Sequence, residues 1–166
     1  MKTIVITGAS RGIGRATAEK FLTEGWRVVG TYYNTPISIT EENFIAFQLD
    51  QGNSESIRRF VESVRKTISR IDVLVNNAAV LLDAYEYVAD IEKIKKTFDV
   101  DLFGVIDLTE RLLSLVSEGS HIVNVDSAYG AFSVPIDDEG SVGYRLAKAA
   151  LNMYTRTLAF RLKNRN

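Results

Sequence analysis

Cysteine is absent from this sequence, and histidine occurs only once, as His121. A chain without cysteine cannot form disulfide bonds, use a catalytic thiolate or bind zinc through sulfur ligands. The single histidine also argues against a metal site built from several imidazoles, so we expect no bound metal. The lack of cysteine fits the reducing conditions of the cytosol, and we expect a cytoplasmic protein.

The sequence also lacks a long apolar segment and an excess of charge of either sign. No stretch approaches the roughly 18 apolar residues of a membrane-spanning helix, and the apolar run near the N-terminus is too short for a signal peptide. The 20 basic and 21 acidic residues are interspersed and give a net charge of −1. This composition offers no electrostatic footprint for a nucleic acid or an anionic membrane, so we expect neither as a partner.

The 166 residues, 46% of them hydrophobic, are enough for a single domain with a buried core. Nearly continuous apolar segments, typical of strands in a parallel sheet, span residues 2–7, 26–33, 43–50, 71–76 and 121–127. Helical spacing of apolar residues predicts helices at 13–24, at 57–68 with Asn53 or Ser54 as the cap, at about 90–117 and after about 140. This alternation predicts an α/β fold, a doubly wound Rossmann-like dinucleotide-binding domain over 1–166 with strand order 3-2-1-4-5.

A glycine-rich turn, TGASRGIG (7–14), joins the first predicted strand to the first predicted helix. Gly8 allows a sharp turn, Gly12 allows the backbone to approach a pyrophosphate, and Gly14 allows the helix to pack closely on the sheet. Free N–H groups and the positive end of the helix dipole then face an anion. The alternative is a strand–helix turn that merely favours glycine. The order of strand, glycines and helix favours dinucleotide binding, with the candidate contacts Gly8, Ser10, Arg11, Gly12, Ile13 and Gly14.

The end of the second predicted strand bears on which dinucleotide is bound. An acidic residue there would bind the free ribose 2′-hydroxyl of NAD, but Tyr32, Tyr33 and Asn34 are not acidic. We take Asn34 as the candidate contact at that place. The guanidinium of Arg11, inside the glycine turn, is suited to pair with a 2′-phosphate. We therefore expect NADP(H) rather than NAD(H); the alternative for Arg11 is a solvated surface arginine.

Tyr144 and Lys148 lie four residues apart in the last predicted helix. This spacing places both side chains on one face, about one turn apart. An ammonium group near a phenol favours the phenolate, which would allow Tyr144 to give and take a proton near neutral pH. The alternative is a pair of ordinary surface residues on a helix.

The sequence resembles the short-chain dehydrogenase/reductase family, in motifs that occur in the family's order and near its spacing. These motifs are TGASRGIG (7–14), NNAA (76–79), IVNVDS (122–127) and YRLAK (144–148). The resemblance spans essentially the whole chain. It implies an NADP(H)-dependent oxidoreductase that interconverts a small-molecule carbonyl and an alcohol, and that assembles as a homodimer or homotetramer.

The resemblance also implies roles at the matching positions. Tyr144 would be the general acid or base, Lys148 would bind the nicotinamide ribose and lower the pKa of the tyrosine, and Ser127 would donate a hydrogen bond to the substrate oxygen. Asp50, at the end of the third predicted strand, would contact the adenine. Asn76 and Ala78 match the segment that lines the cofactor and steadies the sheet.

Three positions depart from the family's pattern. Asp101 stands where an asparagine is common, and we expect its charge to stabilise the Lys148 ammonium and to oppose ionisation of Tyr144. Asp126 stands where a serine is common, and strand alternation points it away from Ser127, so we expect a small effect. Ala79 replaces a glycine, which matters only if the backbone there needs a positive φ.

Members of the family usually continue with two further strands and a substrate-binding lobe, so the fifth predicted strand would here be an edge of the sheet. We expect that the chain is truncated or that its remainder is disordered or missing from the sequence given; the alternative is that another subunit covers the exposed face. The segment 94–116 has large apolar residues around much of its circumference, which suits packing between the sheet and a second helix. By resemblance, this helix and the Tyr144 helix pair across a two-fold axis.

Three functions therefore compete at this stage. The first is an NADP(H)-dependent oxidoreductase with Tyr144 as the proton donor. The second, motivated by Asp101 and the short length, is a non-catalytic or weakly active dinucleotide-binding sensor or scaffold. The third is an oligomerisation domain that binds no nucleotide.

Overall fold

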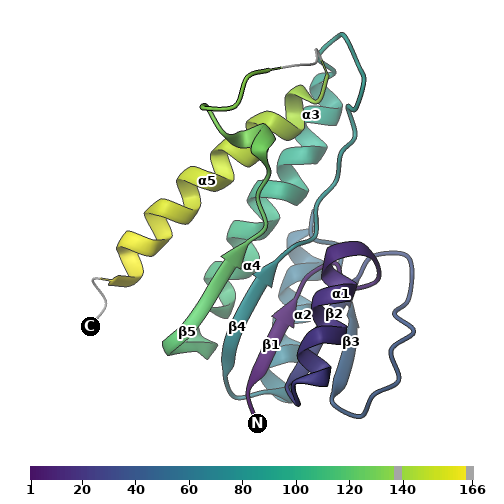
Figure 1. The fold of residues 1–166 in the computed structure, drawn as a ribbon, viewed down its shortest axis with the longest axis vertical. Helices are drawn as coiled ribbons and strands as arrows, with labels where there is room; N and C mark the ends of the chain where they lie inside the picture. Colours follow the sequence, from purple (N-terminus) through teal and green to yellow (C-terminus); the bar gives the residue numbers. More distant parts are fainter. Residues whose placement is uncertain (137–139, 164–166) are drawn as a thin grey trace.

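A single parallel sheet forms the centre of the computed structural model, which describes residues 1–136 and 140–163. Its strands are β1 (Thr3–Ile6), β2 (Arg27–Tyr32), β3 (Phe44–Gln48), β4 (Ile71–Asn76) and β5 (Val116–Asn124). They lie side by side in the order β3-β2-β1-β4-β5, and every neighbouring pair is parallel (Figure 1). The predicted fold class and strand order are thus confirmed, with β5 at one edge of the sheet.

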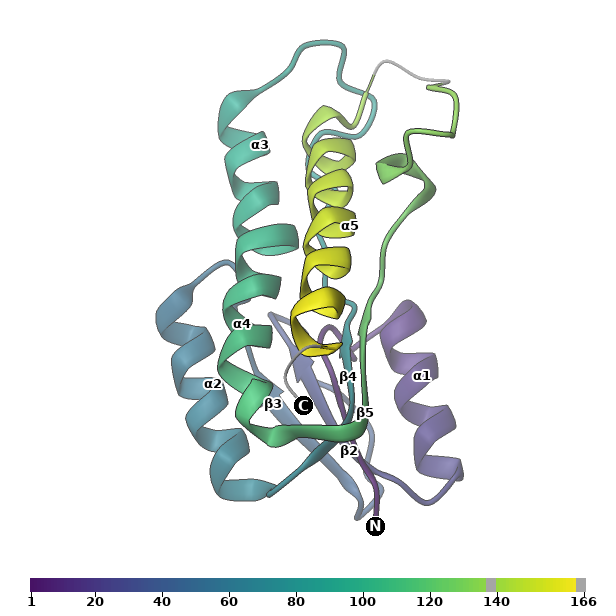
Figure 2. The ribbon, with the colours of Figure 1, turned by 90° about the vertical axis from the view of Figure 1, so that its left-hand side faces the viewer.

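The helices cover both faces of this sheet. They are α1 (Gly12–Thr23), α2 (Ser54–Thr67), α3 (Ile91–Phe98), α4 (Gly104–Leu112) and α5 (Val142–Lys163), with a π-helical turn η1 (Asp99–Phe103) between α3 and α4. Helix α1 covers one face, while α2 and α4 cover the other and α5 lies beside α3 and α4 (Figure 2). Helix α3, the start of α5 and the loops that follow β4 and β5 extend beyond the carboxyl ends of the strands, at the top of Figure 1.

Local signals account for where two of these helices begin. The Asn53 side chain accepts a hydrogen bond from the Ser56 amide at 2.9 Å and caps α2, as one of the two predicted caps. The Asp90 carboxylate accepts from the amides of Glu92 and Lys93 and caps α3 in the same way. Both side chains satisfy N–H groups that the first turn of a helix leaves without a partner.

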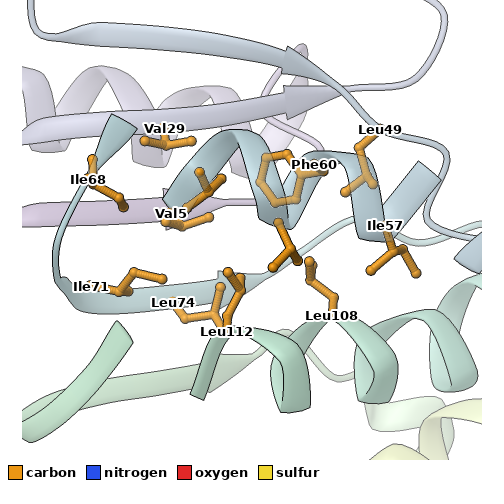
Figure 3. Close-up of a cluster of buried hydrophobic side chains, with 12 residues drawn as sticks. Val5, Val29, Leu49, Ile57, Phe60, Ile68, Ile71, Leu74, Leu108 and Leu112 are labelled. Atoms are coloured by element: carbon orange, nitrogen blue, oxygen red, sulfur yellow. The ribbon is translucent and has the colours of Figure 1, made fainter. Parts of the chain in front are cut away.

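The larger hydrophobic core lies between the sheet and the pair α2 and α4. Val5, Val29 and Leu74 point from the strands toward the helices, where they meet side chains such as Phe60 and Leu108 (Figure 3). These side chains are at most 3% exposed. This core fixes the strands relative to one another. Because the strands are parallel, the carboxyl ends of β1, β2 and β4 lie at the same edge of the sheet, where ligands of such sheets bind.

The predicted boundaries around β5 are wrong at both ends. The helix expected to reach residue 117 ends with α4 at Leu112, a 3₁₀ turn η2 (Leu113–Leu115) follows, and β5 begins at Val116. The ladder with β4 is irregular after Val116 and becomes regular only from His121, because the chain turns at Gly119, whose φ is +78°. At the other end the strand stops at Asn124, so Ser127 lies beyond it and caps the 3₁₀ turn η3 (Ala128–Gly130) through a hydrogen bond from the Tyr129 amide.

None of the helices in residues 1–136 and 140–163 is long and apolar enough to cross a membrane. Within the same residues, no three side chains of histidine, cysteine, aspartate or glutamate are grouped so that they could bind a metal ion.

Candidate active site

A cavity of about 740 Å³ opens at the carboxyl ends of β1, β2 and β4. Its walls come from the glycine-rich turn, from the residues after β2 and β3, and from the segment after β4. Of the residues predicted to bind a cofactor, those that line it are Gly8, Ser10, Arg11, Gly12, Ile13, Asp50 and Ala78. The position and size of the cavity suit an extended ligand such as a dinucleotide.

The glycine-rich turn leaves open space where an anion would sit. Gly12 begins α1 with a φ of +56°, and a Cβ built on it would meet nothing within 4 Å. The residue before it, Arg11, makes no side-chain hydrogen bond to cap the helix, so the N–H groups of the first turn are available to a ligand. Ile13 is 68% exposed toward this space, as expected of an apolar residue that a ligand covers.

Gly14 has a different role, because it lies against the sheet. A Cβ there would come within 2.3 Å of the Gly8 carbonyl oxygen and 2.5 Å of the Asn77 Nδ2 atom. Helix α1 therefore approaches the turn more closely than any side chain allows. Gly14 lies outside the cavity lining, so it supports the turn without facing a ligand.

Asn77, which we did not single out from the sequence, holds the turn in place. Its Nδ2 donates to the main-chain oxygens of Thr7 and Gly8 at 2.9 and 3.2 Å. The Thr7 hydroxyl in turn accepts from the amides of Asn77 and Ala78 at 3.0 and 2.9 Å. The NNAA motif (76–79) contains this asparagine, but the motif alone does not indicate which of its two asparagines faces the glycine-rich turn.

The neighbouring Asn76 points into the protein. It is 2% exposed, lies outside the cavity lining, and donates to the Thr109 hydroxyl and to the Asn124 side-chain oxygen at 2.9 and 2.7 Å. These bonds tie β4 to α4 and β5. The structure therefore places Asn76 where it steadies the sheet and not where it could contact a cofactor.

The part of the cavity next to β2 carries few acidic groups. Tyr32 and Tyr33 line it, whereas Asn34 is exposed and lies outside it. Asp50 lines the cavity and accepts a hydrogen bond from the Gly52 amide at 3.0 Å. The exposed guanidinium of Arg11 borders the same space.

Tyr144, Lys148 and Ser127 come together beside the segment that follows β5, and none of the three lines the cavity. The Lys148 Nζ lies 5.4 Å from the centre of the Tyr144 ring, on the next turn of α5. Burial raises the pKa of Tyr144, and the charges of Asp101 and Asp126 raise it further, while a hydrogen bond with Ser127 lowers it. The net direction is opposite to the lowered value that we expected from Lys148, because burial of the phenol outweighs the favourable contacts.

Lys148 is a buried cation, with 4% of its side chain exposed. Its Nζ donates to the Val125 carbonyl oxygen at 3.0 Å and lies 3.9 Å from the Asp101 Oδ2 atom. Burial lowers the pKa of Lys148, and the charges of Asp101 and Asp126 oppose this shift. The predicted effect of Asp101 on both Lys148 and Tyr144 thus has the expected sign.

Asp101 connects this cluster to the cavity. Its Oδ1 accepts from the amide of Val80, a residue that lines the cavity, at 2.9 Å. Its Oδ2 is buried and makes no hydrogen bond within the described residues. Burial raises the pKa of Asp101 to about 6, against lowering by the Val80 amide and by Lys148.

The other two departures from the family pattern have small consequences. The charge of Asp126 raises the pKa of Tyr144 and of Lys148, but it is the smallest of the contributions to each, in line with the small effect expected. Ala79 carries no strain of the kind considered, since the non-glycine residues with positive φ in the described chain are Tyr85 and Ser141. The change from glycine at 79 is therefore tolerated by the backbone.

The chain matches a family model and many known proteins. The model described as short chain dehydrogenase matches residues 2–166. The 3-oxoacyl-(acyl-carrier-protein) reductase of Synechocystis sp. is 31% identical, over 97% of this chain and 68% of the relative. The corresponding reductase of Thermotoga maritima is also 31% identical, over 99% of this chain and 70% of the relative.

Solved structures agree with these matches. A short chain dehydrogenase from Burkholderia cenocepacia, crystallised in complex with NADP, superimposes with a TM-score of 0.85 at 29% identity, covering 99% of this chain and 69% of that one. A short chain dehydrogenase family protein from Francisella tularensis gives a TM-score of 0.86 at 26% identity, with 98% and 64% covered. The chain spans 55 to 70% of the length of the curated relatives it matches.

Proposed function

Because the chain belongs to the short chain dehydrogenase family, we propose that it is an NADP(H)-dependent oxidoreductase that interconverts a carbonyl and an alcohol. One observation carries the proposal: Tyr144, Lys148 and Ser127 meet outside the lining of a cavity that the glycine-rich turn borders, and Asp101 links Lys148 to Val80 in the cavity wall. NADP(H), when bound, supplies or accepts the hydride. The residues of the chain bind and orient the reactants and move the proton.

The cavity fits the proposed cofactor. The uncapped first turn of α1 and the open space at Gly12 suit the pyrophosphate. Asp50 is the proposed contact for the adenine, and Arg11 for the ribose 2′-phosphate. Lys148 uses one donor on the Val125 carbonyl, which leaves its other N–H groups for the hydroxyls of the nicotinamide ribose.

The proton passes through the phenol of Tyr144. In the reductive direction, Tyr144 gives its proton to the carbonyl oxygen as that oxygen becomes an alcohol, and Ser127 donates a hydrogen bond to the same oxygen. The phenol keeps its proton at neutral pH and can donate it, while its raised pKa makes it a weaker donor. The buried ammonium of Lys148 then stabilises the phenolate that remains.

The cofactor preference can be tested at Arg11. Arg11→Ala is expected to weaken NADPH binding by about tenfold and NADH binding by less than about twofold, because only NADPH carries the 2′-phosphate that the guanidinium pairs with. Dissociation constants from nucleotide fluorescence titrations measure both effects. Arg70→Ala serves as the control, since Arg70 precedes β4 at the opposite rim of the sheet and pairs with Asp72. If Arg11→Ala weakened the binding of NADPH and of NADH by the same factor, Arg11 would not be the contact of the 2′-phosphate.

A non-catalytic dinucleotide-binding module is the second candidate function. It is favoured by Asp101, whose buried carboxyl lies 3.9 Å from Lys148 and raises the pKa of Tyr144. This reading expects saturable NADPH binding without oxidation of NADPH by any ketone, aldehyde or quinone. Oxidation of NADPH by one such compound would exclude it, and the absence of NADPH binding would exclude both candidates.

We also propose that the chain forms homodimers or homotetramers through α5. Leu146, Met153 and Phe160 are 51, 58 and 70% exposed and recur every seven residues, which places them on one face of the helix. Phe103 of the neighbouring turn η1 is 56% exposed. Such a row of apolar side chains is typical of a helix that packs against a second copy.

Met153→Glu is expected to convert the oligomer to monomers, because a two-fold axis brings the new carboxylate of one copy close to that of the other in an apolar contact. Sedimentation velocity or light scattering after gel filtration measures the mass. Val88→Glu is the matched control, as Val88 is 79% exposed but lies in the loop before α3. An unchanged mass in Met153→Glu would rule out this face as the interface.

A further inference from the structure

Asp83 is a buried carboxylate that the proposed mechanism does not use. It is 3% exposed and lies in the loop between β4 and α3. Its Oδ2 accepts from the Gly143 amide at 2.5 Å, and its main-chain oxygen accepts from the Ser141 amide at 2.9 Å. Both partners lie at the start of α5, and Gly143 immediately precedes Tyr144. Asp83 thus joins the loop bordering the cavity to the helix that carries the proposed proton donor.

The backbone around this contact is strained on both sides. Tyr85 and Ser141, with φ of 62° and 63°, are the non-glycine residues with positive φ in the described chain. They flank the contact, and a Cβ on Gly140 would come within 2.8 Å of the Tyr85 nitrogen. Such conformations persist only where the surrounding structure enforces them. The surrounding structure therefore enforces the contact between α5 and the loop that joins β4 to α3.

The start of α5 is also packed too closely to move toward its neighbours. A Cβ on Gly143 would lie 3.1 Å from the Ile94 Cα atom of α3 and 3.2 Å from the Asp83 Oδ2 atom. Sterics prevent the first turn from approaching, and the hydrogen bond to Asp83 prevents it from withdrawing. The hydrogen bond from the Gly143 amide to the Asp83 carboxylate is further favoured because the carboxylate faces the positive end of the dipole of a 22-residue helix.

We propose that Asp83 is a positioning residue for Tyr144. By fixing the first turn of α5 against the loop after β4, it sets the place of the phenol relative to the cavity wall formed by Ala78 and Val80. This inference rests on the proposed function, because the position of Tyr144 matters only if Tyr144 transfers a proton. A displacement of a reacting group by about 1 Å is enough to lower a rate by about 10²-fold.

The test compares Asp83→Ala with Asp83→Asn. The alanine variant loses the acceptor for the Gly143 amide and is expected to lower kcat by about tenfold or more, with KM and the NADPH dissociation constant within about twofold of the native values. The asparagine variant keeps an acceptor oxygen at the same place, and its kcat is expected within about threefold of the native value. If the alanine variant does not fold, Asp83→Ser, whose shorter side chain falls short of the amide, takes its place.

Hydrogen exchange at the Gly143 amide gives a second readout that does not depend on turnover. It is expected to be at least about tenfold faster in Asp83→Ala than in Asp83→Asn. If the native protein turned over no carbonyl, the proposed function would fail, and the exchange rates would still decide whether Asp83 holds α5. Asp83→Ala with native kcat, or with native exchange at Gly143, or with a loss of NADPH affinity as large as the loss of kcat, overturns the inference.

Asp90→Ala is the matched control. Asp90 lies in the same loop and its carboxylate also accepts first-turn amides, at 2.9 and 3.3 Å, but those amides belong to α3. We expect this variant to keep kcat and Gly143 exchange within about twofold of the native values. A loss of kcat in Asp90→Ala equal to that in Asp83→Ala would show that any loosened helix cap in the loop has the same effect, and would also overturn the inference.

Discussion

Tyr144→Phe is expected to lower turnover of a carbonyl substrate by about 10³-fold while the NADPH dissociation constant stays within about twofold. Phenylalanine keeps the ring, which packs edge-on against Tyr129 with the ring centres 6.2 Å apart, so the local fold is preserved. The variant lacks the hydroxyl, and with it the proton that neutralises the substrate oxygen. Single-turnover oxidation of NADPH separates this chemical step from binding.

The helix offers a matched control for that change. Tyr154 lies ten residues further along α5 and its hydroxyl donates to the Glu110 Oε1 atom at 3.2 Å, on the side of α4. Tyr154→Phe is expected to leave turnover within about twofold of the native value. If Tyr144→Phe lost NADPH binding together with turnover, Tyr144 would be a structural residue; if it kept its turnover, another group would supply the proton.

Asp101→Asn is expected to raise the free energy of unfolding by about 2 kcal/mol at about pH 7.5 and to change it little at about pH 4. The pKa of Asp101 is about 6 in the fold against its ordinary value of 3.8. Between these values the native state binds a proton that the unfolded state has lost, so the native protein loses stability as the pH rises. At about 1.4 kcal/mol for each unit of pH, this decline amounts to about 3 kcal/mol.

Two features of the site decide the net size of that effect. Asparagine keeps an oxygen to accept from the Val80 amide, so the bond at 2.9 Å is retained. The variant gives up the attraction of the carboxylate to Lys148, 3.9 Å away, which subtracts from the gain. Urea unfolding of both proteins at the two pH values measures the difference. Asp99→Asn, an exposed carboxylate in the same turn, is the control and is expected to show no such pH dependence.

The same substitution also tests the electrostatics of Tyr144. The charge of Asp101 raises the pKa of Tyr144, so Asp101→Asn is expected to lower it and to shift the pH profile of alcohol oxidation toward lower pH. A stability difference that is the same at about pH 4 and about pH 7.5, or an unshifted profile, would contradict the view that Asp101 is an ionising group of the site.

The fold was predictable because its signals are local. Runs such as 71–76 and the glycines at 8, 12 and 14 encode strand and turn within a few residues, and chain order with right-handed crossovers then restricts the topology. The boundaries of β5 were not predictable in this way. The segment 113–127 is apolar enough for either helix or strand, and the turn at Gly119 and the pairing with β4 decide where the strand begins and ends.

The sequence alone determined the fold class and the glycine-rich turn from side chains that are neighbours in the chain, and the strand order from chain order and right-handed crossovers. It also identified the Tyr144–Lys148 pair from the geometry of one helix. Only the tertiary structure decided that Asn77 braces the glycine turn while Asn76 faces inward, that Asp101 is buried beside Lys148, and that Asp83 holds the start of α5. These contacts join residues 33 to 70 positions apart in the chain. Burial, which raises the pKa of Asp101 and Tyr144, exists only once the elements have packed.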